Sequence, residues 1–262
     1  MDTPTPAETH LAQTIDALGQ ADFTEAMNRW LQAEIRQDNC TILAYFDGRR
    51  PLSLSRSATT NAVHRNFEKT YVAGAYLLDP FHNLHVNRAA AGVYRLSDIA
   101  PDQFHRNPYF LDYYSATTLL DEIAFVTYPA RDISLHICLG RDRSSKSRFN
   151  SKELATAHRI APIVLSLANR QWAGLAAQGD YSDTAVTDRL VASLARTHGI
   201  KLSQRQAEVA FFILRGHSSV SIGLTLGVSP QTVKVFRKQL YRKCAISSQA
   251  ELFRLMLPLL SE

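Results

Sequence analysis

The sequence predicts an α/β (α+β) domain in the first two thirds of the chain and an all-α domain at its end. Up to about residue 175, short β-rich segments with hairpin signals alternate with helical segments. The segment 174–184 is small and polar with two glycines, which is typical of a linker. After Gly199 the periodicity is helical throughout. Nine Lys or Arg stand against three acidic residues there, so the chain's net charge of +5 is concentrated in this part.

Two helices and a hairpin open the chain. Apolar residues recur at helical spacing over 7–19 and again over 22–36. The β-rich stretch 41–46 ends in Asp47-Gly48, a turn signal that predicts a hairpin with a partner strand over 52–57.

The rest of the first domain contributes three more strands, one among helical segments and two as a pair. In chain order we expect a mixed helical segment over 59–90, a strand over 92–96 and an aromatic-rich segment over 101–117. Two strands follow over 121–129 and 133–141, and then a long helix over 151–175. The hairpins favour one antiparallel sheet of about five strands packed with helices. This order resembles the PAS/GAF-type sensory folds.

The last 60 residues carry the clearest local signals. Ser203 opens a capping box, and Gly227 permits a left-handed turn. Ser229 caps the next helix, which has Pro230 at its first position. A short helix, a glycine turn and a basic helix make a helix-turn-helix within four helices. A basic helix of this kind fits the major groove of duplex DNA.

The segment from LSQRQAEV to SSQAEL, about residues 200–255, resembles the LuxR-type (NarL/FixJ-type) DNA-binding domain. The resemblance implies base contacts from Lys234, Val235 and Lys238. It implies contacts near phosphates from four further residues: Thr232, Arg237, Arg242 and Lys243. It also implies dimerisation through the fourth helix, which is apolar enough that part of it is expected to meet a partner. The sequence departs from the family pattern at three places that affect packing more than the reading face: Val220-Ser221-Ile222-Gly223, Phe236 and Cys244-Ala245.

Asp79-Pro80 resembles the Asp-Pro of acyl-homoserine-lactone receptors in the same family, where the Asp accepts the ligand's amide N–H. The aromatic positions that precede it in that pattern fall on Ala62, Asn66 and Thr70, so we expect a "solo" regulator that senses another small molecule. The candidate ligand-binding residues are Tyr76, Asp79, Phe81, Tyr94, Tyr109, Phe110, Tyr113 and Phe125. Ordinary core packing is the alternative for each aromatic residue, and a helix N-cap is the alternative for Asp79.

Other polar groups carry weaker signals. His82 and His85 share one helix side at a spacing that could hold a metal ion, but nine histidines make such pairs expected by chance. Asp121-Glu122 is interpreted as a solvated strand edge. The chain shows no nucleophile, base or phosphate-loop motif, so neither a cofactor, a metal nor an enzyme activity is predicted.

These observations predict a one-component transcription regulator. Residues 1–175 would bind a small-molecule effector, 176–199 would link and connect, and 200–262 would bind duplex DNA, as a homodimer on an inverted repeat. The alternative is a phosphorylation-driven or ligand-independent regulator whose first domain mainly mediates oligomerisation. A receiver domain needs parallel β/α alternation, which the hairpins do not fit. Scattered cysteines, the lack of a signal peptide and the lack of a long apolar run predict a cytoplasmic protein with no membrane partner.

Overall fold

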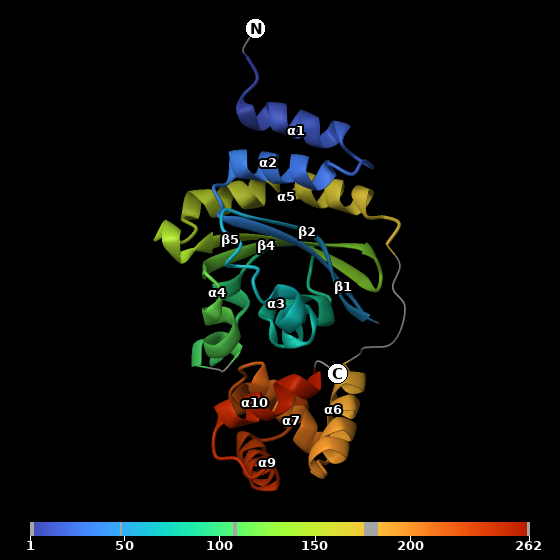
Figure 1. The fold of residues 1–262 in the computed structure, drawn as a ribbon, viewed down its shortest axis with the longest axis vertical. Helices are drawn as coiled ribbons and strands as arrows, with labels where there is room; N and C mark the ends of the chain where they lie inside the picture. Colours follow the sequence, from blue (N-terminus) through green and yellow to red (C-terminus); the bar gives the residue numbers. More distant parts are fainter. Residues whose placement is uncertain (1–2, 48, 107–108, 176–182, 261–262) are drawn as a thin grey trace.

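The computed structural model describes residues 3–47, 49–106, 109–175 and 183–260. It has an α+β part, with helices above and below one sheet, and a helical part beneath it (Figure 1). The first part contains α1 (Pro6–Asp16), α2 (Phe23–Glu34), β1 (Asn39–Phe46), β2 (Arg49–Ala58), α3 (Pro80–Val86), β3 (Gly92–Arg95), α4 (Leu96–Ile99), β4 (Leu119–Ala130), β5 (Ile133–Asp142) and α5 (Ser151–Gln171). The second part contains α6 (Asp183–His198), α7 (Gln204–Leu214), α8 (Ser219–Leu226), α9 (Pro230–Lys243) and α10 (Gln249–Leu260).

The five strands form one sheet in the order β2-β1-β5-β4-β3, with every pairing antiparallel. The β1–β2 hairpin closes where the sequence predicts it, with Phe46 opposite Arg49. The β4–β5 hairpin closes with Ala130 opposite Ile133. The predicted antiparallel sheet packed with helices is confirmed. The doubly wound parallel sheet of a receiver domain is excluded.

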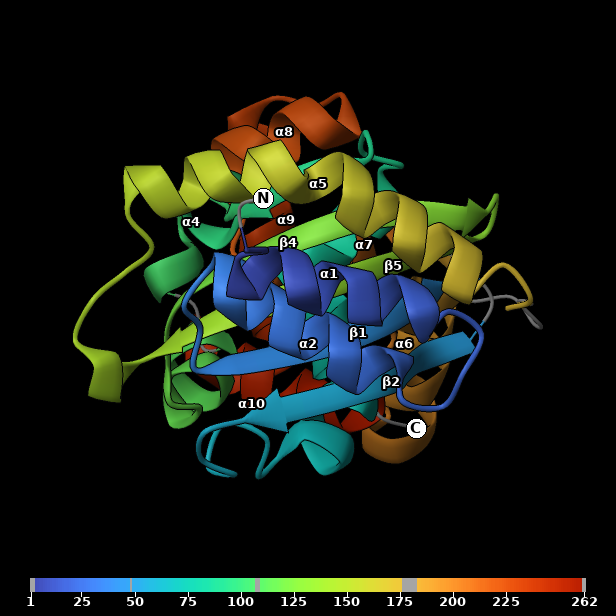
Figure 2. The ribbon, with the colours of Figure 1, turned by 90° about the horizontal axis from the view of Figure 1, so that it is seen from above.

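The two faces of the sheet have different partners because successive side chains of a strand point to opposite faces. On β5, Ile133, Leu135 and Ile137 join the core under α2 and α5, which cover the upper face. The lower face looks toward α3 and the helical part. Figure 2 shows α1, α2 and α5 lying over the sheet, with α1 outermost. A second core cluster runs from the lower face through the turns and into the helical part.

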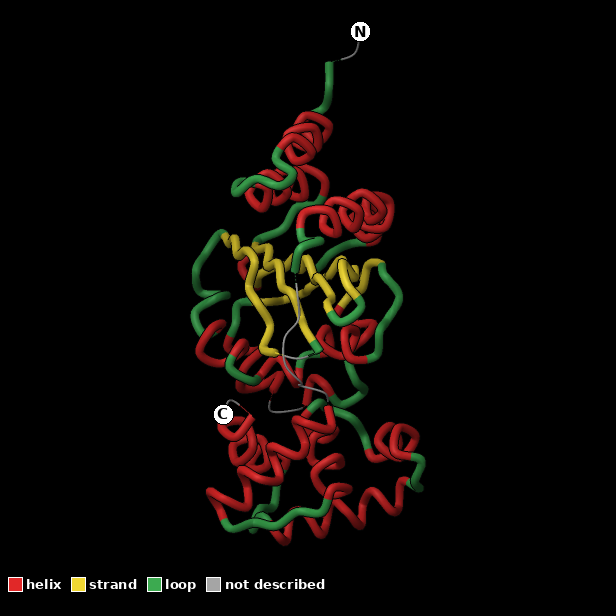
Figure 3. The backbone as a smooth tube through the Cα atoms, turned by 90° about the vertical axis from the view of Figure 1, so that its right-hand side faces the viewer, coloured by secondary structure: helices red, strands yellow, loops and turns green. Residues whose placement is uncertain are grey.

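The segments below the sheet are less regular than predicted. The sequence predicts a mixed helical stretch over 59–90. The chain forms a short π-helix η1 (Phe67–Val72), a short 3₁₀ helix η2 (Ala75–Leu78) and the α-helix α3 there. Pro80 sets this break, because proline begins a helix more readily than it continues one. These turns form the layer between the sheet and the helical part in Figure 3.

The helical part begins and ends its helices at the predicted caps. The Ser203 side chain accepts from the backbone N–H of Gln206, and Ser229 accepts from that of Thr232. Gly227 ends α8 at φ +67°, the left-handed conformation that glycine adopts without strain. Of the linker predicted over 174–184, residues 176–182 lie outside the described residues, and the connecting helix expected after it is α6.

The apolar residues of the fourth helix find partners within this chain, and its contact with a second copy stays a prediction. Leu252, Phe253 and Met256 of α10 are buried within this chain, where α10 packs against α6 and α7. Their apolar character is therefore explained by the core of the helical part itself.

Candidate ligand cavity and nucleic-acid interface

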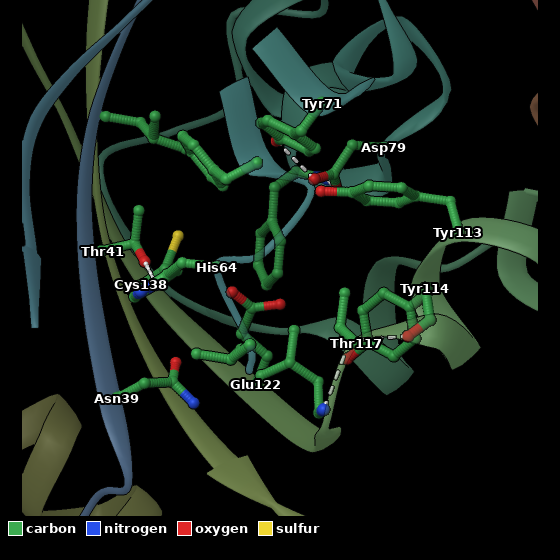
Figure 4. A pocket seen from close by; sticks show the side chains of 15 residues that line it. Asn39, Thr41, His64, Tyr71, Asp79, Tyr113, Tyr114, Thr117, Glu122 and Cys138 are labelled. Carbon is green, nitrogen blue, oxygen red and sulfur yellow. Dashed lines mark hydrogen bonds between the residues drawn. The ribbon is translucent and has the colours of Figure 1, made fainter. Parts of the chain in front are cut away.

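A cavity of about 50 Å³ lies beneath the sheet, bounded by β1, β4 and β5 and by the turns that precede α3 (Figure 4). Such a volume holds roughly three to five water-sized groups. The side chains that line it are those of Asn39, Thr41, Leu43, Val63, His64, Phe67, Tyr71, Asp79, Phe81, Tyr113, Tyr114, Thr117, Leu119, Glu122 and Cys138. Apolar and aromatic walls with a few convergent polar groups are typical of small-molecule sites.

Asp79 is both a helix cap and a cavity residue. Its Oδ1 accepts the backbone N–H of Phe81 at 2.8 Å, and this bond caps α3. Its Oδ2 accepts the hydroxyl of Tyr71 at 2.6 Å. Burial raises the pKa of Asp79 to about 6, while these two hydrogen bonds act in the opposite direction. The N-cap alternative for Asp79 is confirmed, and the residue still borders the cavity.

A second polar group lies along the strands. Thr41 and His64 share a hydrogen bond of 3.0 Å between Oγ1 and Nε2. The thiol of Cys138 on β5 and the carboxyl group of Glu122 on the neighbouring strand β4 both line the cavity. Burial, and after it the negative charges of Asp79 and Asp121, raise the pKa of Glu122 well above its usual range. The cavity therefore combines a hydrogen-bonded Asp79 with a protonatable Glu122.

Three of the predicted ligand-binding residues line this cavity, namely Asp79, Phe81 and Tyr113. Four others lie elsewhere: Tyr76, Tyr94, Phe110 and Phe125. Tyr76 packs against Tyr45 and His82 in the core below the sheet. The side chain of Tyr109 lies outside the described residues.

The remaining misplaced aromatics have separate physical reasons. Phe125 is fully buried in the core above the sheet, because its position on β4 points away from the cavity. Tyr94 donates its hydroxyl to the carbonyl of Ala90 at 2.6 Å. Phe110 stacks on Tyr114 and lines a neighbouring groove instead.

The interpretation of Asp121-Glu122 as a solvated edge is wrong for both residues. Asp121 is buried and pairs with Arg95 at 2.6 Å. Glu122 points to the opposite face and lines the cavity. The signal was available in the alternation of Glu122, Ala124 and Val126 on one face of β4, with Ile123 and Phe125 on the other.

The basic helix α9 presents one exposed face, at the lower end of the molecule in Figure 1. Lys234, Lys238 and Arg242 stand four residues apart and are all exposed, so they form one row along the helix. Val235 lies beside this row and is 47% exposed, although it is apolar. Val233 and Leu240 hold the opposite face in the core. An exposed cationic row with an apolar neighbour suits the phosphates and base edges of a DNA groove.

The other DNA-binding candidates on α9 are also engaged within the protein. Lys243 Nζ donates to the carbonyl of Lys201 and to Oε1 of Gln206, both at 2.9 Å. The Thr232 hydroxyl shares a 2.8 Å hydrogen bond with that of Ser229. Arg237 lies over the ring of Tyr241 at 5.2 Å. These contacts orient α9 within the protein. Lys234, Lys238 and Arg242 are then its most accessible cationic side chains.

The helical part docks on the cavity-bearing part through the end of α7. Arg215 is buried, and its Nε donates to the carbonyl of Leu77 at 2.9 Å. Nearby, the Gln103 N–H donates to the carbonyl of Gly216 at 3.2 Å. These bonds place the helix-turn-helix directly below the turn that leads into Asp79.

Two further properties concern only the described residues. No group of three or more His, Cys, Asp or Glu among them is arranged to hold a metal ion. His85, one of the two histidines considered for such a site, instead shares a 2.9 Å hydrogen bond with the hydroxyl of Ser134. No helix in the same described part is both long and apolar enough to cross a membrane.

Fold and site together define a helix-turn-helix regulator in which an α+β domain with a polar cavity sits on a DNA-binding domain. Residues 201–256 match the family of bacterial regulatory proteins described as the luxR family. Over 187 residues the chain is 32% identical to an HTH-type transcriptional regulator in the exeN 3′ region of Aeromonas salmonicida, covering 68% of this chain and 93% of that protein. The chain belongs to the LuxR family of transcription regulators.

Solved structures resemble the chain as well. The crystal structure of the VqsR LBD domain from Pseudomonas aeruginosa matches with a TM-score of 0.53 and 25% identity, over 63% of this chain and 94% of that one. Escherichia coli SdiA matches with a TM-score of 0.41 and 13% identity, over 97% of this chain and 99% of that one.

Proposed function

We propose that the protein is a one-component regulator whose cavity binds a small-molecule effector and whose α9 reads duplex DNA. The observation that carries this proposal is the direct connection between the two sites. Asp79 borders the cavity, and η2 immediately before it contains Leu77, whose carbonyl accepts a hydrogen bond from Arg215 of the helical part. An effector that binds one arrangement of this contact better than another shifts the orientation of the DNA-binding domain.

The proposed division of labour follows the chain. Residues 1–175 bind the effector, 176–199 connect, and 200–262 bind DNA. Within α9, Lys234, Val235 and Lys238 contact bases, while Thr232, Arg237, Arg242 and Lys243 lie near phosphates. Two copies bind an inverted repeat with half-sites about one helical turn apart.

The DNA-binding half of the proposal is tested on duplexes selected by the full chain from a random library. Lys234→Ala is expected to weaken the selected site by ~1–3 kcal/mol and to relax the preference at one base pair. Arg242→Ala is expected to weaken all sequences alike and to reduce the salt slope by ~1. Unchanged binding of both variants across a salt series would contradict the assignment of α9. Mass photometry of the DNA complex checks the two-copy stoichiometry.

The effector half is tested by thermal-shift screening of metabolites on the full chain. A compound at ~100 times its Kd is expected to stabilise the protein by ~2.7 kcal/mol. Asp79→Asn and Tyr113→Phe should reduce that shift, because both side chains border the cavity. A regulator that works without an effector would show DNA binding in the first experiment and no stabilising compound in the second.

A further inference from the structure

The cavity contains two carboxyl groups and, among its described lining residues, neither lysine nor arginine. Its one basic side chain is His64. Burial, and after it the charge of Arg56, lower the pKa of His64 to about 4, so that this imidazole is neutral at pH 7. Arg56 itself lies over the Phe67 ring and pairs with Glu68 at 3.1 Å. The described lining of the cavity therefore holds two acidic side chains and no charged basic side chain.

The carboxyl groups of Asp79 and Glu122 differ in how many hydrogen bonds they accept from the protein. Both oxygens of Asp79 accept hydrogen bonds from the chain, from Tyr71 and from the Phe81 N–H. Beside Glu122 the polar neighbour in the cavity wall is the Cys138 thiol, and a thiol is at most a weak donor. An ionised carboxylate can accept about four hydrogen bonds, so most of its acceptor capacity is unused. In Figure 4 this carboxylate points into the pocket, apart from Asp79.

A second group in the same wall is also unsatisfied. The hydroxyl of Tyr114 is buried and has no hydrogen-bond partner in the described structure, while its ring stacks on Phe110. A buried polar atom without a partner costs about 1–3 kcal/mol and is uncommon in native proteins. Tyr114 and Glu122 both line the cavity. A ligand that supplies hydrogen bonds there would satisfy both groups.

We infer that the effector presents a cationic nitrogen, an ammonium or amidinium group, to Glu122. This inference rests on the proposed effector-binding function and names the chemical class of the effector. Desolvation favours the protonated form of Glu122 in the effector-free protein, and a cationic nitrogen beside it would favour the ionised form, because the described wall provides no cation of its own. A carboxylate or phosphate ligand would instead meet two acids at close range, which is unfavourable.

The rest of the wall fits the apolar part of such a compound. The Tyr71 ring stacks on both Phe67 and Tyr113, with distances between ring centroids of 5.1 Å and 5.9 Å. Aromatic rings also attract cations through their π faces. The small volume admits a compact head group, so we expect an amine with a short apolar remainder.

Cys138 gives a direct test, because its thiol lines the cavity beside Glu122. The full chain is treated with three methanethiosulfonates of different charge: 2-aminoethyl (cationic), methyl (neutral) and 2-sulfonatoethyl (anionic). Each transfers its alkylthio group to the cysteine sulfur as a disulfide and releases methanesulfinate. Peptide mass spectrometry gives the rate at Cys138 separately from Cys40 and Cys244, and the same chain in urea gives the intrinsic rate of each reagent.

The expected result is a cation-to-anion rate ratio at Cys138 at least about tenfold higher in the folded chain than in urea. Glu122→Gln should remove most of this preference, whereas Glu25→Gln on the exposed face of α2 should retain it. Equal normalised rates of the cationic and the anionic reagent at Cys138 of the wild type would overturn the inference and still show that the cavity is accessible. This outcome is measured on the wild-type chain, so it does not depend on whether a variant folds. Failure of every compound to stabilise the full chain in the thermal-shift screen would overturn the proposed effector cavity, and the inference with it.

Discussion

Arg215, at the end of α7, donates its Nε–H to the backbone carbonyl of Leu77 at 2.9 Å, although 138 residues separate them in the chain. The guanidinium also lies over the Phe211 ring at 4.2 Å. Leu77 belongs to η2, which ends at Leu78 directly before Asp79, so one short segment carries both the cap of α3 and the contact with the helical part. Asp79 is therefore connected to the end of α7 through two residues of backbone and one hydrogen bond.

Arg215→Gln is expected to loosen the two parts of the protein. The substitution removes the Nε donor, and an unsatisfied buried carbonyl costs ~1–3 kcal/mol. We expect a larger radius of gyration by small-angle X-ray scattering and two calorimetric transitions in place of one. Arg205→Gln, on the exposed side of the same helix, is the matched control. A single transition at an unchanged Tm would show that Arg215 does not hold the parts together.

Lys243→Ala should lower both stability and DNA affinity, whereas Lys238→Ala should lower DNA affinity alone. Lys243 bridges α9 to the Lys201 carbonyl and to Gln206, the residue that completes the Ser203 capping box. Losing these two bonds is expected to cost about 1 kcal/mol in the free energy of unfolding. Urea titration and fluorescence anisotropy with selected DNA measure the two effects. Equal stability of the two variants would leave Lys243 without its proposed structural role.

The helix-turn-helix could be predicted from sequence because its signals are local. Ser203, Ser229 and Gly227 each act within three or four residues of the chain, and the structure places each at the cap it predicts. The antiparallel sheet could be predicted for the same reason, since Asp47-Gly48 marks a hairpin without knowledge of distant contacts.

The cavity could be predicted only in part because its residues come together through strand pairing. Asp79 stood out through the local Asp-Pro cap. Glu122 and Cys138 reach the same wall only in the register that places Glu122 opposite Gly140 and Cys138 opposite Ala124. Phe125 was predicted to bind the ligand but lies in the other core, because adjacent residues of a strand such as Ala124 and Phe125 point to opposite faces of the sheet.

Gly223→Ala is expected to destabilise the helix-turn-helix even though alanine favours helices. A Cβ at this position would lie 2.7 Å from the backbone carbonyl oxygen of Val228, closer than real contacts allow. The backbone of the turn would have to shift, and the bond from the Val228 N–H to the Gly223 carbonyl would shift with it. We expect a loss of about 1–3 kcal/mol and weaker DNA binding. Gly92→Ala, which meets nothing within 4 Å, is the control; equal unfolding free energies in the two variants would contradict the close packing at Gly223.

Glu122→Gln is expected to stabilise the effector-free protein increasingly as the pH rises. Burial raises the pKa of Glu122 above its usual value of 4.5, so the folded protein holds a proton that the unfolded chain has already released. The folded state then binds more protons than the unfolded state, and stability falls as the pH rises above about 4.5. Glutamine has the same shape and stays neutral at every pH, so it avoids this penalty. We expect urea unfolding to show an advantage for the variant that is larger at pH 8 than at pH 5 by at least ~1 kcal/mol, whereas Glu25→Gln should show no such change. An advantage independent of pH would mean that Glu122 ionises freely in the folded protein, as a solvated carboxylate does.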